Sequence, residues 1–150
     1  MSLALTPEQR ELADSLGRFA ARHAPLTSTR KTFDAVARGD LPPWWDDLVA
    51  NGFHAVHLPE RHGGQGGELV DAGCVLEAAG KAALAGPLVP TVTAGAVALL
   101  AHPSPSAQSL LTQLAAGTPA AVILPQHASF RARADGDCWL ISGASEVTAG

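Results

Sequence analysis

A run of glycines in the middle of the chain limits the possible folds more than any other feature. Residues 63–67 read Gly-Gly-Gln-Gly-Gly, and Pro59 stands four residues before them. Proline and clustered glycines disfavour helices, so we expect helical structure to resume only at Glu68. The apolar segment 53–58 is too short for a helix and predicts a strand-like stretch. The chain therefore bends sharply here, where backbone amides can come close to a ligand.

After this loop, apolar residues recur at spacings of three and four. The pattern predicts a helix with one buried stripe. The residues of the stripe are Leu69, Ala72, Val75, Leu76, Ala79 and Ala83. Glu77 stands four residues before Lys81. On a helix, this spacing favours an ion pair between the two side chains.

The composition is that of a folded chain and excludes several functions. With 150 residues, of which 47% are apolar and 16% charged, the chain can bury a core. The net charge is −4 and the ten Lys and Arg residues are scattered, which argues against nucleic-acid binding. No uninterrupted apolar stretch reaches the roughly 20 residues that span a bilayer. We expect no membrane insertion and, because the N-terminus lacks signal-peptide features, a cytoplasmic location.

The N-terminal segment has the signature of a capped amphipathic helix. Thr6 can cap the helix, Pro7 suits its first turn, and Gln9 completes a capping box. We expect this helix to run to about His23. Its predicted inner face consists of Leu12, Leu16, Phe19 and Ala20.

Four further helices are expected from breakers and apolar patterns. A weak helix covers 30–38, and a short one covers 41–52 and ends at an Asn-Gly pair. The segment 91–102 is apolar nearly all round, which predicts a deeply buried helix. The last helix begins at Ser104 and ends at Gly117, with Leu110, Leu111, Leu114 and Ala115 inside. The adjacent Trp44 and Trp45 are interpreted as core anchors rather than a ligand platform.

From Pro119 onward the pattern changes to that of strands. The segment 121–124 is a short apolar run, and 130–134 alternates apolar and charged residues. A turn at 135–137 and a second run at 138–142 predict a hairpin, and 146–148 could begin another strand. We therefore divide the chain into a helical domain, 1–118, and the start of a β-domain, 119–150.

The sequence does not favour a dinucleotide-binding loop or a metal site. The glycine loop fails the dinucleotide-binding spacing, because the third glycine would fall at Leu69. The densest group of potential metal ligands, whose spacing matches no recurring zinc site, is His54, His57, Glu60 and His62. We expect no metal, and a helical metal protein that uses His54, His57 and His62 is a third hypothesis. Cys74 and Cys138 lie far apart, and we expect no disulfide.

Five stretches of the sequence carry a resemblance to a known family. They are LTPEQRELADSLGRFA at 5–20, WDDLVANGF at 45–53, LPERHGGQGG at 58–67, ELVDAGCVLEAAGKA at 68–82 and PLVPT at 87–91. Their order resembles the N-terminal region of flavin-dependent acyl-CoA dehydrogenases, especially the divergent actinobacterial type. The resemblance implies a mainly α fold, in which an N-terminal helical bundle precedes the first strands of an antiparallel β-domain. The switch at Pro119 matches the first domain boundary of that family.

The resemblance also implies an activity. The family oxidises an acyl-CoA thioester between its α and β carbons, with a glutamate as base and FAD as hydride acceptor. It implies an acyl-CoA or acyl-carrier thioester as substrate, and a homo- or hetero-oligomer with other dehydrogenase-like chains. Val89 and Thr91 would lie in the wall of the acyl pocket. The catalytic glutamate of the family belongs to its C-terminal domain, so no residue of this chain takes that role.

The flavin-contacting motifs of the family are poorly matched. Its Thr-Glu-Pro-x-x-Gly-Ser-Asp loop corresponds to 123–129, where Gln126 stands in place of the glutamate and the Gly-Ser pair has no counterpart. In the second motif, Val147 replaces the tryptophan that covers the flavin, and Thr148 matches the flavin-contacting threonine after one deletion. The expected cofactor-binding residues are Leu124, Gln126, Val147 and Thr148. A non-catalytic acyl-binding or structural subunit with a degenerate flavin site is the alternative hypothesis.

Overall fold

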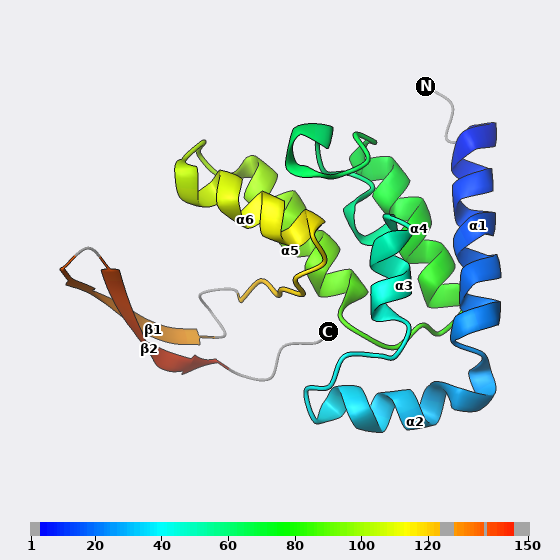
Figure 1. The fold of residues 1–150 in the computed structure, drawn as a ribbon, viewed down its shortest axis with the longest axis horizontal. Helices are drawn as coiled ribbons and strands as arrows, with labels where there is room; N and C mark the ends of the chain where they lie inside the picture. The colour runs from blue at the N-terminus through cyan, green and yellow to red at the C-terminus, as the bar shows by residue number, and fades with distance from the viewer. Residues whose placement is uncertain (1–3, 124–127, 137, 146–150) are drawn as a thin grey trace.

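The described part of the chain is a bundle of helices followed by one β-hairpin. The computed structural model describes residues 4–123, 128–136 and 138–145. Its helices are α1 (Pro7–His23), α2 (Leu26–Ala37), α3 (Trp45–Ala50), α4 (Leu69–Lys81), α5 (Leu88–Leu100) and α6 (Pro105–Ala115), with short 3-10 turns η1 (Phe53–Ala55) and η2 (Glu60–His62). The hairpin of β1 (Ala128–Asp135) and β2 (Cys138–Ser145) projects away from the bundle beyond α6 (Figure 1). The predicted fold class is confirmed.

The helices α1 and α4 lie side by side and are linked at their N-termini (Figure 1). The predicted capping box of α1 is present, because Gln9 N–H donates to Thr6 Oγ1 over 3.2 Å and Thr6 N–H donates to Gln9 Oε1 over 3.0 Å. Gln9 Nε2 also donates to Asp71 Oδ1 over 3.0 Å, while Asp71 Oδ2 accepts the N–H of Glu68 over 2.8 Å. One side-chain bond thus joins the capped starts of both helices.

The main core lies between α1, α3, α4 and the start of α5. Leu16 and Leu48 are fully buried, and Trp44 and Trp45 are each 2% exposed, so the prediction of core anchors is confirmed. Phe19 packs edge to face on Phe53, with ring centroids 5.7 Å apart. A second, smaller cluster joins α5 and α6 to the loop that follows α3, and it contains Ala55, Leu58, Ala94, Ala98, Leu111 and Leu114.

The segment before the glycine loop is not strand-like, and that prediction was wrong. Residues 53–55 form the 3-10 turn η1, and the loop folds back so that Gly66 N–H donates to Leu58 O and Gly67 N–H donates to Val56 O, both over 2.9 Å. A short apolar run has no periodicity to separate a strand from a tight turn. A Cβ on Gly64 would lie 2.1 Å from Leu58 O, so the close return of the backbone requires glycine there.

Several helix boundaries differ from the predicted ones. The helix α2 begins at Leu26 rather than 30, α3 begins only at Trp45, after two prolines, and α5 begins at Leu88 rather than Thr91. Proline fixes a backbone angle that suits a first helical turn, so Pro90 did not delay α5. The segment 121–123 is not a strand. The remainder of that predicted strand lies outside the described residues.

Two members of the predicted α4 stripe, Leu69 and Ala83, are exposed, and Leu76 is half-buried. Leu69 is the first residue of α4 and is 64% exposed. Ala83 lies after the end of α4 at Lys81 and has a positive φ of 50°, with its N–H donating to Gly80 O over 3.0 Å. The centre of the stripe is confirmed, since Ala72, Val75 and Ala79 are buried.

The predicted hairpin is confirmed. Strands β1 and β2 pair antiparallel, with Phe130 opposite Gly143 and Ala132 opposite Ile141. Gly136 turns the chain with φ of 61°. Phe130, Trp139 and Ile141 are at least half exposed, so this hairpin has no covered face among the described residues. The strand predicted at 146–148 lies outside the described residues.

Candidate functional site

The outer face of α5 is apolar and exposed. The inner face of the helix is buried through Leu88, Val92 and Ala98, but the opposite face carries Val89 at 53%, Val97 at 47% and Leu100 at 89% exposure. The prediction of a deeply buried helix was therefore wrong for this face. A helix that is hydrophobic on both sides is normally covered on both sides. We call Val89, Thr93, Val97 and Leu100, which share this side, the outer face of α5.

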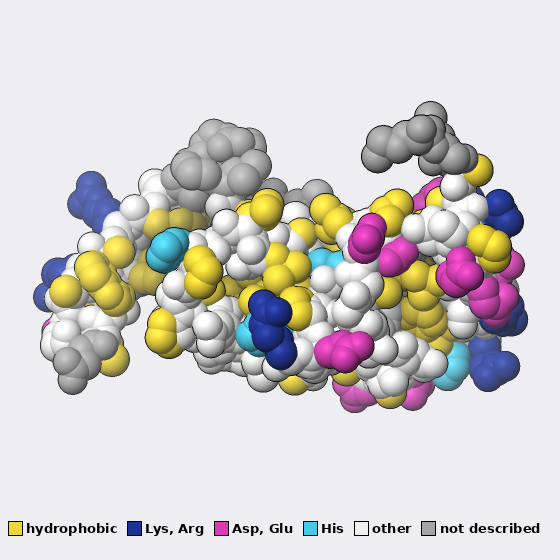
Figure 2. Space-filling model, turned by 90° about the horizontal axis from the view of Figure 1, so that it is seen from above, with side chains coloured by type: hydrophobic (Ala, Val, Ile, Leu, Met, Phe, Trp, Pro, Cys, Tyr) yellow, Lys and Arg dark blue, Asp and Glu magenta, His cyan; other side chains and the backbone are white. Residues whose placement is uncertain are grey.

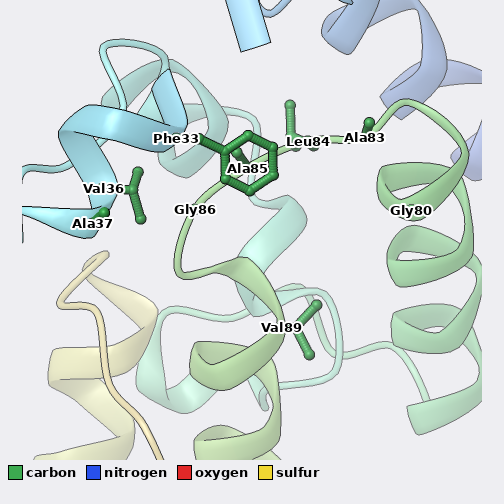
Figure 3. A pocket seen from close by; sticks show the side chains of 9 residues that line it. All are labelled: Phe33, Val36, Ala37, Gly80, Ala83, Leu84, Ala85, Gly86 and Val89. Carbon is green, nitrogen blue, oxygen red and sulfur yellow. The ribbon is translucent and has the colours of Figure 1, made fainter. Parts of the chain in front are cut away.

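An open apolar pocket adjoins the first turn of this helix. It has a volume of about 400 Å³ and lies between α2 and the turn that joins α4 to α5 (Figure 3). Phe33 and Val36 come from α2, Leu84 comes from the turn, and Val89 comes from α5. No charged side chain is among its lining residues. The pocket can therefore accept an apolar group, but it offers no side-chain partner to phosphates.

The two predicted substrate-binding residues occupy different environments. Val89 lines the pocket and points toward it (Figure 3). Thr91 is 2% exposed, and its Oγ1 accepts the N–H of Ala120 over 3.2 Å and lies 3.5 Å from Ala120 O. Thr91 thus links the segment after α6 to α5. Its contact with a substrate stays a prediction.

The four predicted flavin-contacting residues lie outside the described part of the chain. These residues are Leu124, Gln126, Val147 and Thr148. The hairpin between them exposes both faces, and its described side chains form no enclosed cradle for a flavin. The residues expected to contact FAD belong to 124–127 and 146–150, outside the described part of the chain.

The residues of the histidine cluster lie in different environments. His54 and His57 are buried, at 2% and 5% exposure, whereas His62 is near the surface with Nδ1 3.4 Å from Thr112 Oγ1. Among the described residues, no three histidine, cysteine or acidic side chains are placed to hold a metal ion. His54 Nε2 lies 3.0 Å from Ala115 O, so a hydrogen bond joins the ring to the C-terminal end of α6. Burial lowers the pKa of both His54 and His57, which favours neutral imidazoles.

Other titratable residues have structural or surface roles. The predicted pair of Glu77 and Lys81 is present with a 2.7 Å contact at the surface. Its hydrogen bond and charge lower the pKa of Glu77 and raise that of Lys81. Cys74 and Cys138 are free, and burial raises the pKa of the Cys74 thiol, which makes it a poor nucleophile.

The comparisons with known proteins assign the helical region. A family model described as "Acyl-CoA dehydrogenase, N-terminal domain" matches residues 6–118. The chain belongs to the acyl-CoA dehydrogenase family. The predicted resemblance is thereby confirmed, and the family is one of oxidoreductases.

Individual relatives agree with this assignment. The chain is 39% identical over 114 residues to acyl-CoA dehydrogenase IpdE2 of Mycobacterium tuberculosis, a match covering 75% of this chain and 35% of that protein. It is 35% identical over 107 residues to Mycobacterium leprae fadE25, named a probable acyl-CoA dehydrogenase, covering 64% and 28%. The solved structure titled "Tcur3481-Tcur3483 steroid ACAD G363A variant" matches with a TM-score of 0.75 and 28% identity, over 93% of this chain and 40% of that one. The chain thus spans about a third of the curated relatives, 35% and 28% of their lengths.

Sequence reasoning missed the contribution of α2 and the exposure of the outer face of α5. The available signal was the stretch 88–100, which contains no charged residue on any face.

Figure 2 shows acidic side chains concentrated toward the α1 end of the molecule and apolar patches across its middle. Within the described ranges, no helix is long and apolar enough to cross a membrane.

Proposed function

We propose that this chain is the N-terminal part of a flavin-dependent acyl-CoA dehydrogenase. The main observation that supports this proposal is the family match across residues 6–118. The reaction would remove a proton from the α carbon and a hydride from the β carbon of an acyl thioester, giving a 2-enoyl thioester. FAD, when bound, supplies the hydride acceptor. The base would lie outside residues 1–150, since these span only 35% of IpdE2 and 28% of fadE25.

The outer face of α5 is proposed to form one wall of the acyl site. Val89 supports this role, because it belongs both to that face and to the apolar pocket. Thr91 would act behind this wall through its contacts with Ala120. The flavin contacts proposed for Leu124, Gln126, Val147 and Thr148 follow from the family resemblance. The boundary between the helical domain and the β-domain is proposed at residue 118, where the family match ends.

A ring-bearing acyl group is the proposed substrate class. The solved relative is titled a steroid acyl-CoA dehydrogenase. The pocket between α2 and α5 supports this proposal, because its apolar walls enclose about 400 Å³, within the usual range for a small-molecule site. Partner chains of the same family, alike or unlike, and a cytoplasmic location complete the proposal.

The first test is the visible spectrum of the purified protein together with any chains that co-purify. A flavin band that bleaches on adding an acyl-CoA is the expected result. A preparation that remains colourless, and takes up no FAD when its partners are present, would favour the non-catalytic acyl-binding subunit. The poorly matched flavin motifs around Gln126 and Val147 are the observation that keeps this second function in view.

The pocket is tested by filling it. Phe33→Trp should weaken binding of a polycyclic acyl-CoA about tenfold or more, because the added ring atoms occupy the space the ligand needs. Leu26→Trp is the matched control, since Leu26 lies on the same helix and is 70% exposed outside this pocket. Calorimetry would measure the affinity of both variants for the polycyclic acyl-CoA. Equal affinities would mean that this pocket is not part of the acyl site, and would leave the family assignment unaffected.

A further inference from the structure

His57 lies directly beneath α5. A Cβ placed on Gly95 would stand 2.8 Å from His57 Nε2, so the ring edge contacts the helix where it has no side chain. His57 is only 5% exposed, yet neither of its ring nitrogens has a hydrogen-bond partner among the described residues. The Val92 carbonyl approaches the ring and favours its charged form, but the geometry does not make a hydrogen bond. The imidazole therefore occupies a site suited to its neutral form.

His54 holds the neighbouring helix in a similar way. Its Nε2 lies 3.0 Å from Ala115 O at the end of α6, and its Nδ1 has no partner among the described residues. Trp45 Nε1 donates to Gly117 O over 2.9 Å just beyond. Both histidines thus belong to the loop that follows α3, and each contacts one helix of the α5–α6 pair.

Within the part of the chain that the structure describes, no acidic side chain pairs with either ring. The helices α5 and α6 contain no charged side chain. The other elements packed near this loop carry Asp46 and Asp47 on α3, Asp71, Glu77 and Lys81 on α4, and Glu60, Arg61 and His62 on η2. Among the described residues, none of these side chains forms an ion pair or a hydrogen bond with His54 or His57. The charge of His54 also helps to lower the pKa of His57, after the larger effect of burial.

The packing around these histidines is weaker than in the main core. The cluster that joins the second half of α5 and α6 to the loop consists of three alanines and three leucines, whereas the main core holds Phe19, Trp44, Trp45 and Phe53. Local opening is favoured where little apolar surface is buried. The second half of α5, together with all of α6, can therefore separate from the bundle while α1 and α4 remain packed.

We propose that His54 and His57 form an acid-sensitive latch that holds the second half of α5 and all of α6 on the bundle. Ionising either imidazole buries a positive charge with at least one ring N–H that has no partner among the described residues, and releases this helical pair while α1 and α4 stay folded. The latch would also position the proposed acyl wall, because Val97 and Leu100 lie on the released part of α5.

The direction of the pH effect follows from proton binding. Burial lowers the pKa of both histidines below the ordinary value of 6.5, so the latched state binds fewer protons than the open state. The latch is fully formed above pH 6.5 and weakens as the pH falls below it. For each proton that the open state binds and the latched state does not, the equilibrium constant for opening rises about tenfold for each unit by which the pH falls. This rise ends when the pH reaches the pKa of the histidine in the latched state.

Hydrogen exchange of the whole protein between pH 7.5 and pH 5.0 tests the latch, with rates corrected for the intrinsic effect of pH. Amides of residues 94–116 should lose protection about tenfold or more, while those of α1 and α4 should not. His57→Leu should reduce this pH dependence, because leucine cannot ionise. His102→Gln is the matched control, since His102 is exposed between α5 and α6 and its replacement should leave the pH dependence unchanged.

A second variant pair tests the geometry without relying on one mutant. Gly95→Ala should lower the melting temperature in the wild-type background, because its Cβ would lie 2.8 Å from His57 Nε2 and 3.1 Å from Leu58 Cδ2. In a His57→Ala background only the Leu58 contact remains, so the same substitution should cost clearly less. Unchanged pH dependence in His57→Leu, parallel loss of protection in α1 and α4, or an equal loss from Gly95→Ala in both backgrounds would overturn the proposal.

Discussion

The helices α1 and α5 both bury one face, but their opposite faces differ. Outside, α1 carries Glu8, Arg10, Glu11, Asp14 and Arg18. The exposed side of α5 instead carries Val89, Val97 and Leu100. Both helices have the spacing of a packing helix, yet only α1 has the polar face of a finished surface. The difference supports the proposal that α5 forms part of a site or interface, since the outer side of α1 already has the polar character of a solvated surface.

The core of α1 gives the largest expected effect. Leu16 on α1 is fully buried in the core cluster that also contains Trp44 and Trp45, so Leu16→Ala should lower the free energy of unfolding by about 2–5 kcal/mol. Val97→Ala on the outer face of α5 is the matched control and should change it by less than about 0.5 kcal/mol. Urea unfolding followed by tryptophan fluorescence measures both. Similar losses in the two variants would mean that the faces do not differ as described.

The cap of α1 should give an intermediate effect. Thr6→Ala removes the hydroxyl that accepts the Gln9 N–H and should cost about 1 kcal/mol, whereas Thr6→Ser keeps the hydroxyl and should cost little. The corresponding position before α5 is Pro87, which makes no side-chain cap. Thermal unfolding of the two Thr6 variants gives the comparison. An equal loss in alanine and serine variants would show that the cap does not stabilise α1.

The link between α5 and the segment after α6 should contribute less. Thr91→Val keeps the shape of the side chain but removes its hydrogen bonds with Ala120, at a cost of about 0.5–1.5 kcal/mol. Thr93→Val is the control, because Thr93 is exposed on the other side of α5 and bonds only to Val89 O within the helix. If Thr93→Val destabilises the fold as much as Thr91→Val, the contact with Ala120 is not a tether.

The sequence predicted those features that depend on local signals. The capping box at Thr6 and Gln9, the stop of α6 at Gly117 and the hairpin around Gly136 were all predictable, because capping and turn residues act over a few positions. The segment 53–58 was mispredicted, because its conformation depends on backbone bonds from the glycine loop.

The candidate site was only partly predictable. Val89 was proposed from the family resemblance, and the structure places it at the pocket. Phe33 and Val36 were missed, because no local pattern shows that α2 would approach the start of α5. The exposure of Val97 and Leu100 was also missed, since apolar residues around a helix do not show which of its faces the rest of the chain covers.

The most direct test of the central claim is the labelling rate of a cysteine on the outer face of α5. Val97→Cys and, as control, Asp14→Cys on α1 would be made in a Cys138→Ser background, because Cys138 is exposed and Cys74 is buried. The flavin-loaded protein, with any chains that co-purify, would be labelled with and without a polycyclic acyl-CoA. We expect the ligand to slow labelling at position 97 about tenfold or more and to leave position 14 unchanged, as burial by a ligand requires. Equal labelling of position 97 with and without saturating ligand would contradict the assignment of this face to the acyl site.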